Sequence, residues 1–243
     1  MGWQELIPGY GRVRVVRSWE AFAATPLDGD CNAVCLSREL DGDFAEVARL
    51  AGSGGGVQAL PESLLSSTAL SAGAQQAAEA MLSDLERLRE LGQAPGIECV
   101  TGYPKDEDEI ASTDVYSFHV DSATVPTETI LCTYVGRPSE GLRLDEARRL
   151  VDVPETRERL FERFIGDAPG RDAGMNAERF EIYLRESHLD LHYVPLPEAQ
   201  PFSFGTGHLW RLAVQYPGCS APAFIHRAPS EGGESGARLL LIS

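Results

Sequence analysis

The sequence predicts an α+β protein whose second half forms an antiparallel β-sandwich or barrel. Seven short runs after Pro95 are rich in β-branched and aromatic residues, and glycine and proline turns separate them. A helical stretch at about 144–187 interrupts these runs. The first half contains an amphipathic helix at 74–91, where apolar residues recur at helical spacing and Gly92 provides a stop.

The predicted elements of the first half are strands and helices in a mixed order. Residues 12–16 and 32–36 are typical of strands, and residues 44–51 are typical of a helix. Ser18 is a suitable N-cap for a short helix that ends at Ala24. Because no long disordered linker follows, we expect residues 1–95 to wrap around the core, with the N-terminal helices packed outside it.

Residues 96–243 contain the predicted β-core. Its expected strands are 97–102, 115–120, 129–135, 191–196, 208–215, 223–227 and 238–242. The insert at about 144–187 carries three expected helices, at 145–151, 155–165 and 177–187. Inserted segments of this kind often cover a binding site, so we expect the insert to form a lid.

Composition excludes several classes of function. The 243 residues carry a net charge of −16, which disfavours nucleic acid and membrane surfaces as partners. No apolar run is long enough to cross a bilayer, and the start lacks the pattern of a secretory signal, so we expect a cytoplasmic protein. The five cysteines form no CxxC pair, which favours buried, reduced thiols.

The most informative motif is His119-Val120-Asp121, followed far downstream by His226. On a strand, His119 and Asp121 point to the same side, while Val120 points to the other. Two imidazoles and one carboxylate can occupy one face of an iron(II) octahedron and leave the remaining positions open. Arg238 follows after a glycine-rich turn, and we expect 223–227 and 238–242 to pair as an antiparallel hairpin that brings Arg238 near His226.

A second HxD pattern competes with the first. His188, Asp190 and His192 would share one face if that stretch were extended. However, the stretch directly follows a helical pattern, so His188 is expected at a helix end. The interval from there to His226 is also short for a metal site of this kind. We therefore interpret this second cluster as structural, and the role of its residues stays open.

Four segments carry a resemblance to known proteins. The order HxD, a long interval, HRxP, a turn and an arginine-bearing strand resembles the iron(II)- and 2-oxoglutarate-dependent dioxygenases, whose fold is a double-stranded β-helix, or jelly roll. More narrowly, the chain resembles an uncharacterised bacterial domain family. The segments are Phe118-His119-Val120-Asp121, Leu131-Cys132-Thr133-Tyr134, His226-Arg227-Ala228-Pro229 and Arg238-Leu239-Leu240-Leu241. The resemblance begins at about Tyr116 and runs to the C-terminus.

The resemblance implies a role for each matching residue. His119, Asp121 and His226 would be the iron ligands, and Arg238 would bind the distal carboxylate of the cosubstrate 2-oxoglutarate. The usual Arg-x-Ser pair is absent because Leu240 occupies the serine position. A hydroxyl from another strand would have to replace it, and Thr133 and Tyr134 are the candidates. The presence of a carboxylate at Asp121 favours hydroxylation over halogenation, since related halogenases have a small residue there.

Other polar and aromatic residues are candidates for supporting roles. Trp210 could contact the substrate or belong to the core. Arg211 and Arg227 could reach an acidic substrate or lie at the surface. Ser122 and Thr124 could hydrogen-bond the metal ligands or form a turn. His208, at a turn, receives no role.

The leading functional hypothesis is an oxygenase that uses iron(II), 2-oxoglutarate and dioxygen to hydroxylate or otherwise oxidise a small molecule. An amino-acid-like compound or a specialised metabolite would suit a compact pocket under the insert. Two alternatives stay open: a cupin-like metal enzyme without 2-oxoglutarate, and a non-catalytic jelly-roll binding module.

Overall fold

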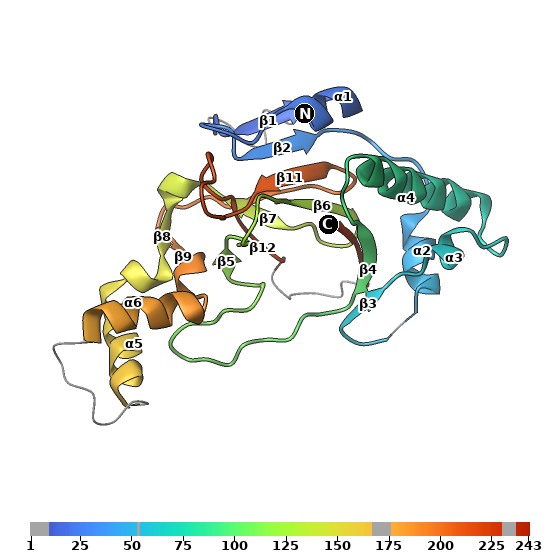
Figure 1. Cartoon of the computed structure of the whole chain (residues 1–243). Helices are drawn as coiled ribbons and strands as arrows, with labels where there is room; N and C mark the ends of the chain where they lie inside the picture. The colour runs from blue at the N-terminus through green and yellow to red at the C-terminus, as the bar shows by residue number, and fades with distance from the viewer. Residues whose placement is uncertain (1–9, 53, 167–175, 230–236) are drawn as a thin grey trace.

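Two sheets with helices around them form the protein (Figure 1). The structure is a computed structural model that describes residues 10–52, 54–166, 176–229 and 237–243. The seven-stranded sheet has the order β1-β2-β11-β6-β13-β4-β3. Its strands are β1 (Val13–Val16), β2 (Ala33–Leu36), β3 (Val57–Ala59), β4 (Gly96–Val100), β6 (Glu128–Val135), β11 (Leu209–Ala213) and β13 (Arg238–Ile242). All neighbours in this sheet are antiparallel except the parallel pair β1 and β2.

The second sheet is wholly antiparallel, with the strand order β10-β7-β12-β5-β9-β8. Its strands are short: β5 (Phe118–His119), β7 (Glu140–Leu142), β8 (Ala147–Arg149), β9 (His192–Pro195), β10 (Phe202–Ser203) and β12 (Ile225–Arg227). This sheet brings residues near positions 118, 192 and 226 onto adjacent strands, and it therefore supplies the candidate site.

Helices cover the outer face of the seven-stranded sheet. They are α1 (Trp19–Ala24), α2 (Phe44–Leu50), α3 (Glu62–Leu65) and α4 (Ala72–Glu90). The apolar face of α4, with Met81 and Leu85, shares one buried cluster with Ile130, Leu239 and Leu241 of the sheet. Ser71 caps α4 through its side chain, which accepts a hydrogen bond from the backbone of Ala74. The N-terminal region thus builds part of the main sheet through β1 to β3 and covers it with helices.

The inner faces of the two sheets pack against each other. An aromatic cluster fills the space between them, with Trp210 and Leu240 from the larger sheet and Phe202, Phe204 and Phe224 from the β10 and β12 region. Within the aromatic cluster, the rings of Phe204 and Trp210 stack at 4.4 Å between centroids. The aromatic residues fill one part of the space between the sheets. The strands that carry the histidines lie next to this part.

The insert forms a separate helical unit beside β8 and β9, away from α2 to α4 (Figure 1). Its helices are α5 (Pro154–Gly166) and α6 (Asn176–Glu186), and they pack on a small core that includes Leu160, Phe164 and Phe180. The expected helix at 145–151 is wrong, because this segment forms two 3-10 turns on either side of β8. Within the described residues, no helix is long and apolar enough to cross a membrane.

The expected hairpin between 223–227 and 238–242 is also wrong. β12 pairs with β5 and β7 in the smaller sheet, whereas β13 pairs with β4 and β6 in the larger one. The reason lies in burial: Arg238 to Leu241 are all buried, so β13 needs a central place in a sheet with both faces covered. The glycine-rich turn at 230–236 lies outside the described residues.

Candidate metal centre

Three histidines lie side by side across the smaller sheet. His119 of β5 is paired in register with His226 of β12 on one side and with His192 of β9 on the other. Directly opposed residues of antiparallel strands point to the same face. Phe118 and Ile225, one position away, belong to the apolar cluster on the other face. The three imidazoles therefore project into the interior, toward the seven-stranded sheet.

His119, Asp121 and His226 converge. Their nearest potential donor atoms all lie within 4.8 Å of one another, and they are the only such group among the described residues. His119 Nε2 lies 3.8 Å from Asp121 Oδ1, and His226 Nε2 lies 3.6 Å from Asp121 Oδ2. These separations are slightly wider than the roughly 3 Å expected between neighbouring ligands at about 2.1 Å from one ion. Small side-chain rotations would close the difference.

Hydrogen bonds orient each residue of this triad. His119 Nδ1 lies 2.8 Å from the carbonyl oxygen of Ser117, and His226 Nδ1 lies 3.3 Å from that of Phe224. Since a carbonyl only accepts, both rings carry their proton on Nδ1 and turn an unprotonated Nε2 toward Asp121. The hydroxyl of Thr129 donates to Asp121 Oδ2. Such outer hydrogen bonds commonly fix metal-binding side chains.

Thr129, rather than Ser122 or Thr124, donates the hydrogen bond to Asp121. Ser122 and Thr124 are exposed, and Ser122 only forms an isolated backbone bridge with Gln215. Thr129 belongs to β6 in the opposite sheet, on the same face as Leu131 of the interior cluster. The sequence did not reveal this role, because Thr129 lies outside the HxD motif, on a strand of the other sheet.

The electrostatics of the triad suit a divalent cation. Burial lowers the pKa of His226 to about 4, although the neighbouring Asp121 opposes this shift. Burial raises the pKa of Asp121, but His226, the Thr129 hydrogen bond and His119 together bring it below its usual value. Near neutral pH the site therefore presents a neutral His226 and an ionised carboxylate, the forms that bind a metal. The Asp121 side chain is 33% exposed, so the site opens on this side.

Arg238 is a buried cation surrounded by hydroxyl groups. Only 6% of it is exposed, and it projects from the same face of β13 as Leu240, which lies in the interior cluster. One terminal nitrogen donates to Thr133 Oγ1 at 3.0 Å and to Ser139 Oγ at 2.7 Å, and the other lies 3.5 Å from the hydroxyl of Tyr103. Its Nε is buried and has no hydrogen-bond partner among the described residues.

No ion pair joins Arg238 to a carboxylate of the described residues, although the charge of Glu98 influences the pKa of Arg238. Burial lowers the pKa of Arg238, and the charges of Tyr103 and Glu98 only partly oppose this effect. A buried guanidinium with hydroxyl neighbours can bind a carboxylate of a ligand.

Of the two proposed hydroxyl partners of Arg238, the structure places only Thr133 beside it. Tyr134 points to the opposite face of β6, where its hydroxyl donates to Asp84 at 2.7 Å and its ring stacks on Phe44. Ser139 and Tyr103 were not identified from the sequence. Ser139 directly precedes β7 and Tyr103 follows β4, and neither position carries a motif.

The three candidates for substrate contact all have contacts within the fold. Trp210 is fully buried and donates through Nε1 to the carbonyl of Phe204. Arg227 pairs with Glu140 and covers the ring of Phe118.

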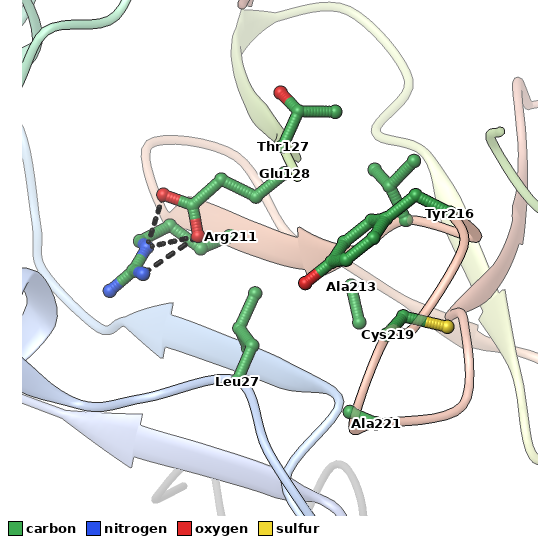
Figure 2. A pocket seen from close by; sticks show the side chains of 9 residues that line it. Leu27, Thr127, Glu128, Arg211, Ala213, Tyr216, Cys219 and Ala221 are labelled. Carbon is green, nitrogen blue, oxygen red and sulfur yellow. Dashed lines mark hydrogen bonds and ion pairs between the residues drawn. The ribbon is translucent and has the colours of Figure 1, made fainter. Parts of the chain in front are cut away.

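Arg211 likewise holds the fold together. It forms an ion pair with Glu128, and it donates to the carbonyls of Phe22 and Thr25 at the end of α1. Figure 2 shows Arg211 turned toward Glu128 at one end of a small pocket that Tyr216 and Cys219 also line. These contacts satisfy the charge of Arg211 within the fold.

The second HxD pattern does not assemble as a metal site. His188 is exposed and adopts a left-handed conformation (φ 57°) just after α6. Asp190 lines a charged surface cleft with residues of α5, α6 and η3 (Leu150–Asp152). His192 alone turns to the interior, where its ring centroid lies 5.7 Å from that of His119.

Comparisons with known proteins add no assignment. The chain matches no protein-family model, and no curated protein or solved structure shows significant similarity to it.

Proposed function

We propose that this protein is an iron(II)- and 2-oxoglutarate-dependent oxygenase built on a jelly-roll core. The observation that carries the proposal is the convergence of two histidines of one sheet with an aspartate just beyond β5, together with a buried arginine on the facing sheet. Two facing, mainly antiparallel sheets are compatible with a jelly roll. Two imidazoles with one carboxylate are the donor set of non-heme iron(II) oxygenases.

The donor set fits the metal in chemistry, and its nearest atoms lie within 4.8 Å of one another. The residues His119 and His226 would supply neutral nitrogen ligands, and Asp121 would supply an anionic oxygen. Three ligands on one side leave room for a bidentate keto acid and dioxygen. When bound, the iron and the keto acid together supply the activation of dioxygen that the side chains themselves lack.

Arg238 supports 2-oxoglutarate as the cosubstrate. The guanidinium is buried, and among the described residues it lacks a carboxylate partner and its Nε has no hydrogen-bond acceptor. It would bind the distal carboxylate of the keto acid, while Thr133 and Ser139 hold the guanidinium in place. These two hydroxyls would take over the part of the serine that Leu240 replaces.

The remaining residues would orient the substrate and exclude water. The ring of Phe204 lies 6.5 Å from that of His226 and contributes an apolar wall next to the metal position. The exposed side of Asp121 leaves an entrance for a small molecule. As a ligand of the metal, Asp121 would also take the place that a halide would need, which favours hydroxylation or a related oxidation.

The first test is spectroscopic. Anaerobic addition of 2-oxoglutarate to the iron(II)-loaded protein should produce a weak visible charge-transfer band, and admission of oxygen should then yield succinate. His119→Ala should abolish metal binding and the band. Arg238→Met should bind iron normally but require far more 2-oxoglutarate for the same band.

The matched control is His188→Ala, which changes an exposed histidine outside the triad. It should behave as wild type in every assay. A wild-type protein that binds iron but gives no band would favour a metal enzyme without 2-oxoglutarate. A protein that binds neither iron, zinc nor nickel would exclude a metal enzyme and favour a binding module.

A further inference from the structure

A buried ion pair lies on the opposite face of the larger sheet from Arg238, and the proposed site does not use it. Arg38, which follows β2, donates from its two terminal nitrogens to the two carboxylate oxygens of Asp84 on α4, at 2.6 and 2.5 Å. Asp84 is only 3% exposed and also accepts from the hydroxyl of Tyr134 on β6 at 2.7 Å. These three side chains connect α4 both to β6 and to the segment after β2.

Stability alone does not explain this ion pair. Removing a carboxylate and a guanidinium from water costs free energy that offsets much of their attraction, and apolar residues of similar size often serve a core equally well. Asp84 stands on the apolar face of α4, with the buried residues Met81 and Leu85. A leucine in its place would extend the hydrophobic cluster. What the charged pair adds is direction, because a bidentate guanidinium and carboxylate hold each other in one orientation.

The ion pair is connected to a β-bulge. Thr133 of β6 is paired with Leu240 of β13. The next pair joins Val135 to Leu239, so Tyr134 is an extra residue on β6. The side chains of Tyr134 and Val135 both belong to the buried cluster beneath α4, as expected where the alternation of a strand is interrupted. The extra residue is therefore the one whose hydroxyl the ion pair holds.

The bulge lies beside the guanidinium of Arg238. Thr133, just before the extra residue, accepts from Arg238 at 3.0 Å. Gly136, just after the bulge, lies against Arg238: a Cβ atom there would be 3.0 Å from the Cα and Cβ atoms of Arg238. Its φ of 91° also favours glycine. The position of the bulge along β6 therefore determines which residues of this strand contact Arg238.

A second chain of hydrogen bonds runs from Arg38 to the main chain of Thr133. Arg38 Nε donates to the carbonyl oxygen of Gly207 at 2.8 Å. The backbone N–H of Gly207 donates to the carbonyl oxygen of Thr133, also at 2.8 Å. The main chain of Thr133 is thus held through Arg38, and the residue that follows it is held through Asp84.

We propose that the ion pair of Asp84 and Arg38 positions the guanidinium of Arg238 for its anionic ligand. The pair fixes the bulge at Tyr134 and the main chain of Thr133, and the Thr133 hydroxyl in turn orients Arg238. Asp84 and Arg38 are positioning residues, because they lie on the other face of the sheet from the ligand. This inference rests on the proposed function, since it takes the distal carboxylate of the keto acid as that ligand.

Two variants remove the positioning in different ways. Tyr134→Phe removes only the hydroxyl that connects the bulge to the ion pair, and it decides alone if the second variant does not fold. The second variant combines Arg38→Met, Asp84→Leu and Tyr134→Phe, and with apolar side chains in place of the polar group it should be at least as stable to urea as wild type. Tyr183→Phe is the matched control, because its hydroxyl also bonds a charged side chain, Arg163, but in the insert.

The first measurement needs no ligand. In protein with ¹⁵N-labelled arginine, the N–H protons of Arg238 that are bonded to Thr133 and Ser139 should exchange slowly with solvent. This exchange should be about tenfold faster in both variants, within the range expected for coupling through contiguous contacts. It should be unchanged in Tyr183→Phe.

The second measurement is the affinity for 2-oxoglutarate, from the charge-transfer band of the iron(II) protein. It should fall by about tenfold in both variants, for the same reason. The affinity for iron(II) should stay the same, because the triad does not depend on the bulge. A general loosening of the fold would instead weaken the binding of metal and keto acid together.

Unchanged exchange at Arg238 in both variants would overturn the inference, and so would a joint loss of iron and 2-oxoglutarate affinity. A wild type that gives no charge-transfer band, but in which exchange at Arg238 still depends on Tyr134, would reject the oxygenase and leave the positioning role. A band with the same 2-oxoglutarate affinity in wild type and both variants would support the oxygenase and reject the positioning role.

Discussion

At the scale of single residues, Thr129 links the metal position to the larger sheet. Its hydroxyl donates to the same oxygen of Asp121 that faces His226 Nε2. This bond favours one orientation of the carboxylate. Metal binding therefore costs less conformational entropy.

Thr129→Val removes the hydroxyl but keeps the shape of the side chain. We expect a weaker affinity for iron(II) or zinc(II), by about tenfold or more, because the carboxylate loses its hydrogen bond. Thr129→Ser should restore most of the affinity. Thr127→Val is the control, since Thr127 is exposed and lines only the pocket of Figure 2. Competition with a chelator measures each affinity, and equal values for Thr129→Val and wild type would exclude this role.

His208 predicts how stability depends on pH. Burial, and then the charge of Arg38, lower the pKa of His208 to about 4, and its Nδ1 accepts from the backbone of Arg38. The unfolded chain takes up a proton near pH 6.5, whereas the folded chain stays neutral. The stability that this residue contributes is therefore complete above about pH 6.5 and is lost as the pH falls toward 4.

His208→Asn keeps a hydrogen-bond acceptor that does not titrate. Between pH 7 and pH 5, urea unfolding should show a loss of stability that is smaller than in wild type by about 1 kcal/mol. His188→Asn, at an exposed position, should follow the wild-type curve. Parallel curves for His208→Asn and wild type would refute the prediction.

At the scale of elements, β7 brings the aromatic cluster close to the metal position. Gly141 is paired in register with both His226 and Phe202. A methyl group at Gly141 would lie 2.6 Å from the ring of Phe202 and 3.0 Å from that of Phe204. The strand therefore accepts only glycine here without displacing aromatic residues beside His226.

Gly141→Ala should destabilise the protein by about 1–3 kcal/mol in urea unfolding, because two packed rings must move. It should also weaken metal binding, since Phe204 lies next to His226. Gly96→Ala is the matched control in a strand: a methyl group there meets nothing within 4 Å. Similar stabilities of the two variants would mean that the rings adjust without cost.

At the scale of the whole molecule, metal binding should raise the thermal stability of the protein. A ligand that binds only the folded state adds about 2.7 kcal/mol at a concentration of 100 times its dissociation constant. The melting temperature should therefore increase with added iron(II) or zinc(II), as followed by calorimetry. His119→Ala should lose this increase, whereas Arg238→Met should keep it and lose only the further increase from 2-oxoglutarate. An increase of the same size in His119→Ala would place the metal elsewhere.

Local sequence patterns predicted the triad, but they did not predict how the sheets meet. Alternation along residues 118–121 correctly put His119 and Asp121 on one face, because Phe118 and Val120, which alternate with them, are apolar and buried on the other. The same reasoning left Thr133 and Tyr134 equivalent as partners of Arg238. β6 is buried on both faces, so hydrophobicity does not reveal which face is the inner one.

The sequence did not predict which strands pair with each other when they lie far apart in the chain, for a similar reason. A run of four apolar residues such as Leu239 to Ile242 of β13 indicates a central position but not which neighbours the strand has. Ser139 and Tyr103 reach Arg238 only because β6, β7 and β4 bring their ends together, and that depends on the pairing of the whole sheet.

The separation of His226 and Arg238 into different layers has one more consequence. A dicarboxylate that reaches from the iron to the guanidinium would act as a non-covalent cross-link between the two layers. Iron alone, by contrast, would tie together only neighbouring short strands of one layer. Amide protons of β13 should therefore exchange more slowly with the keto acid present than with iron alone.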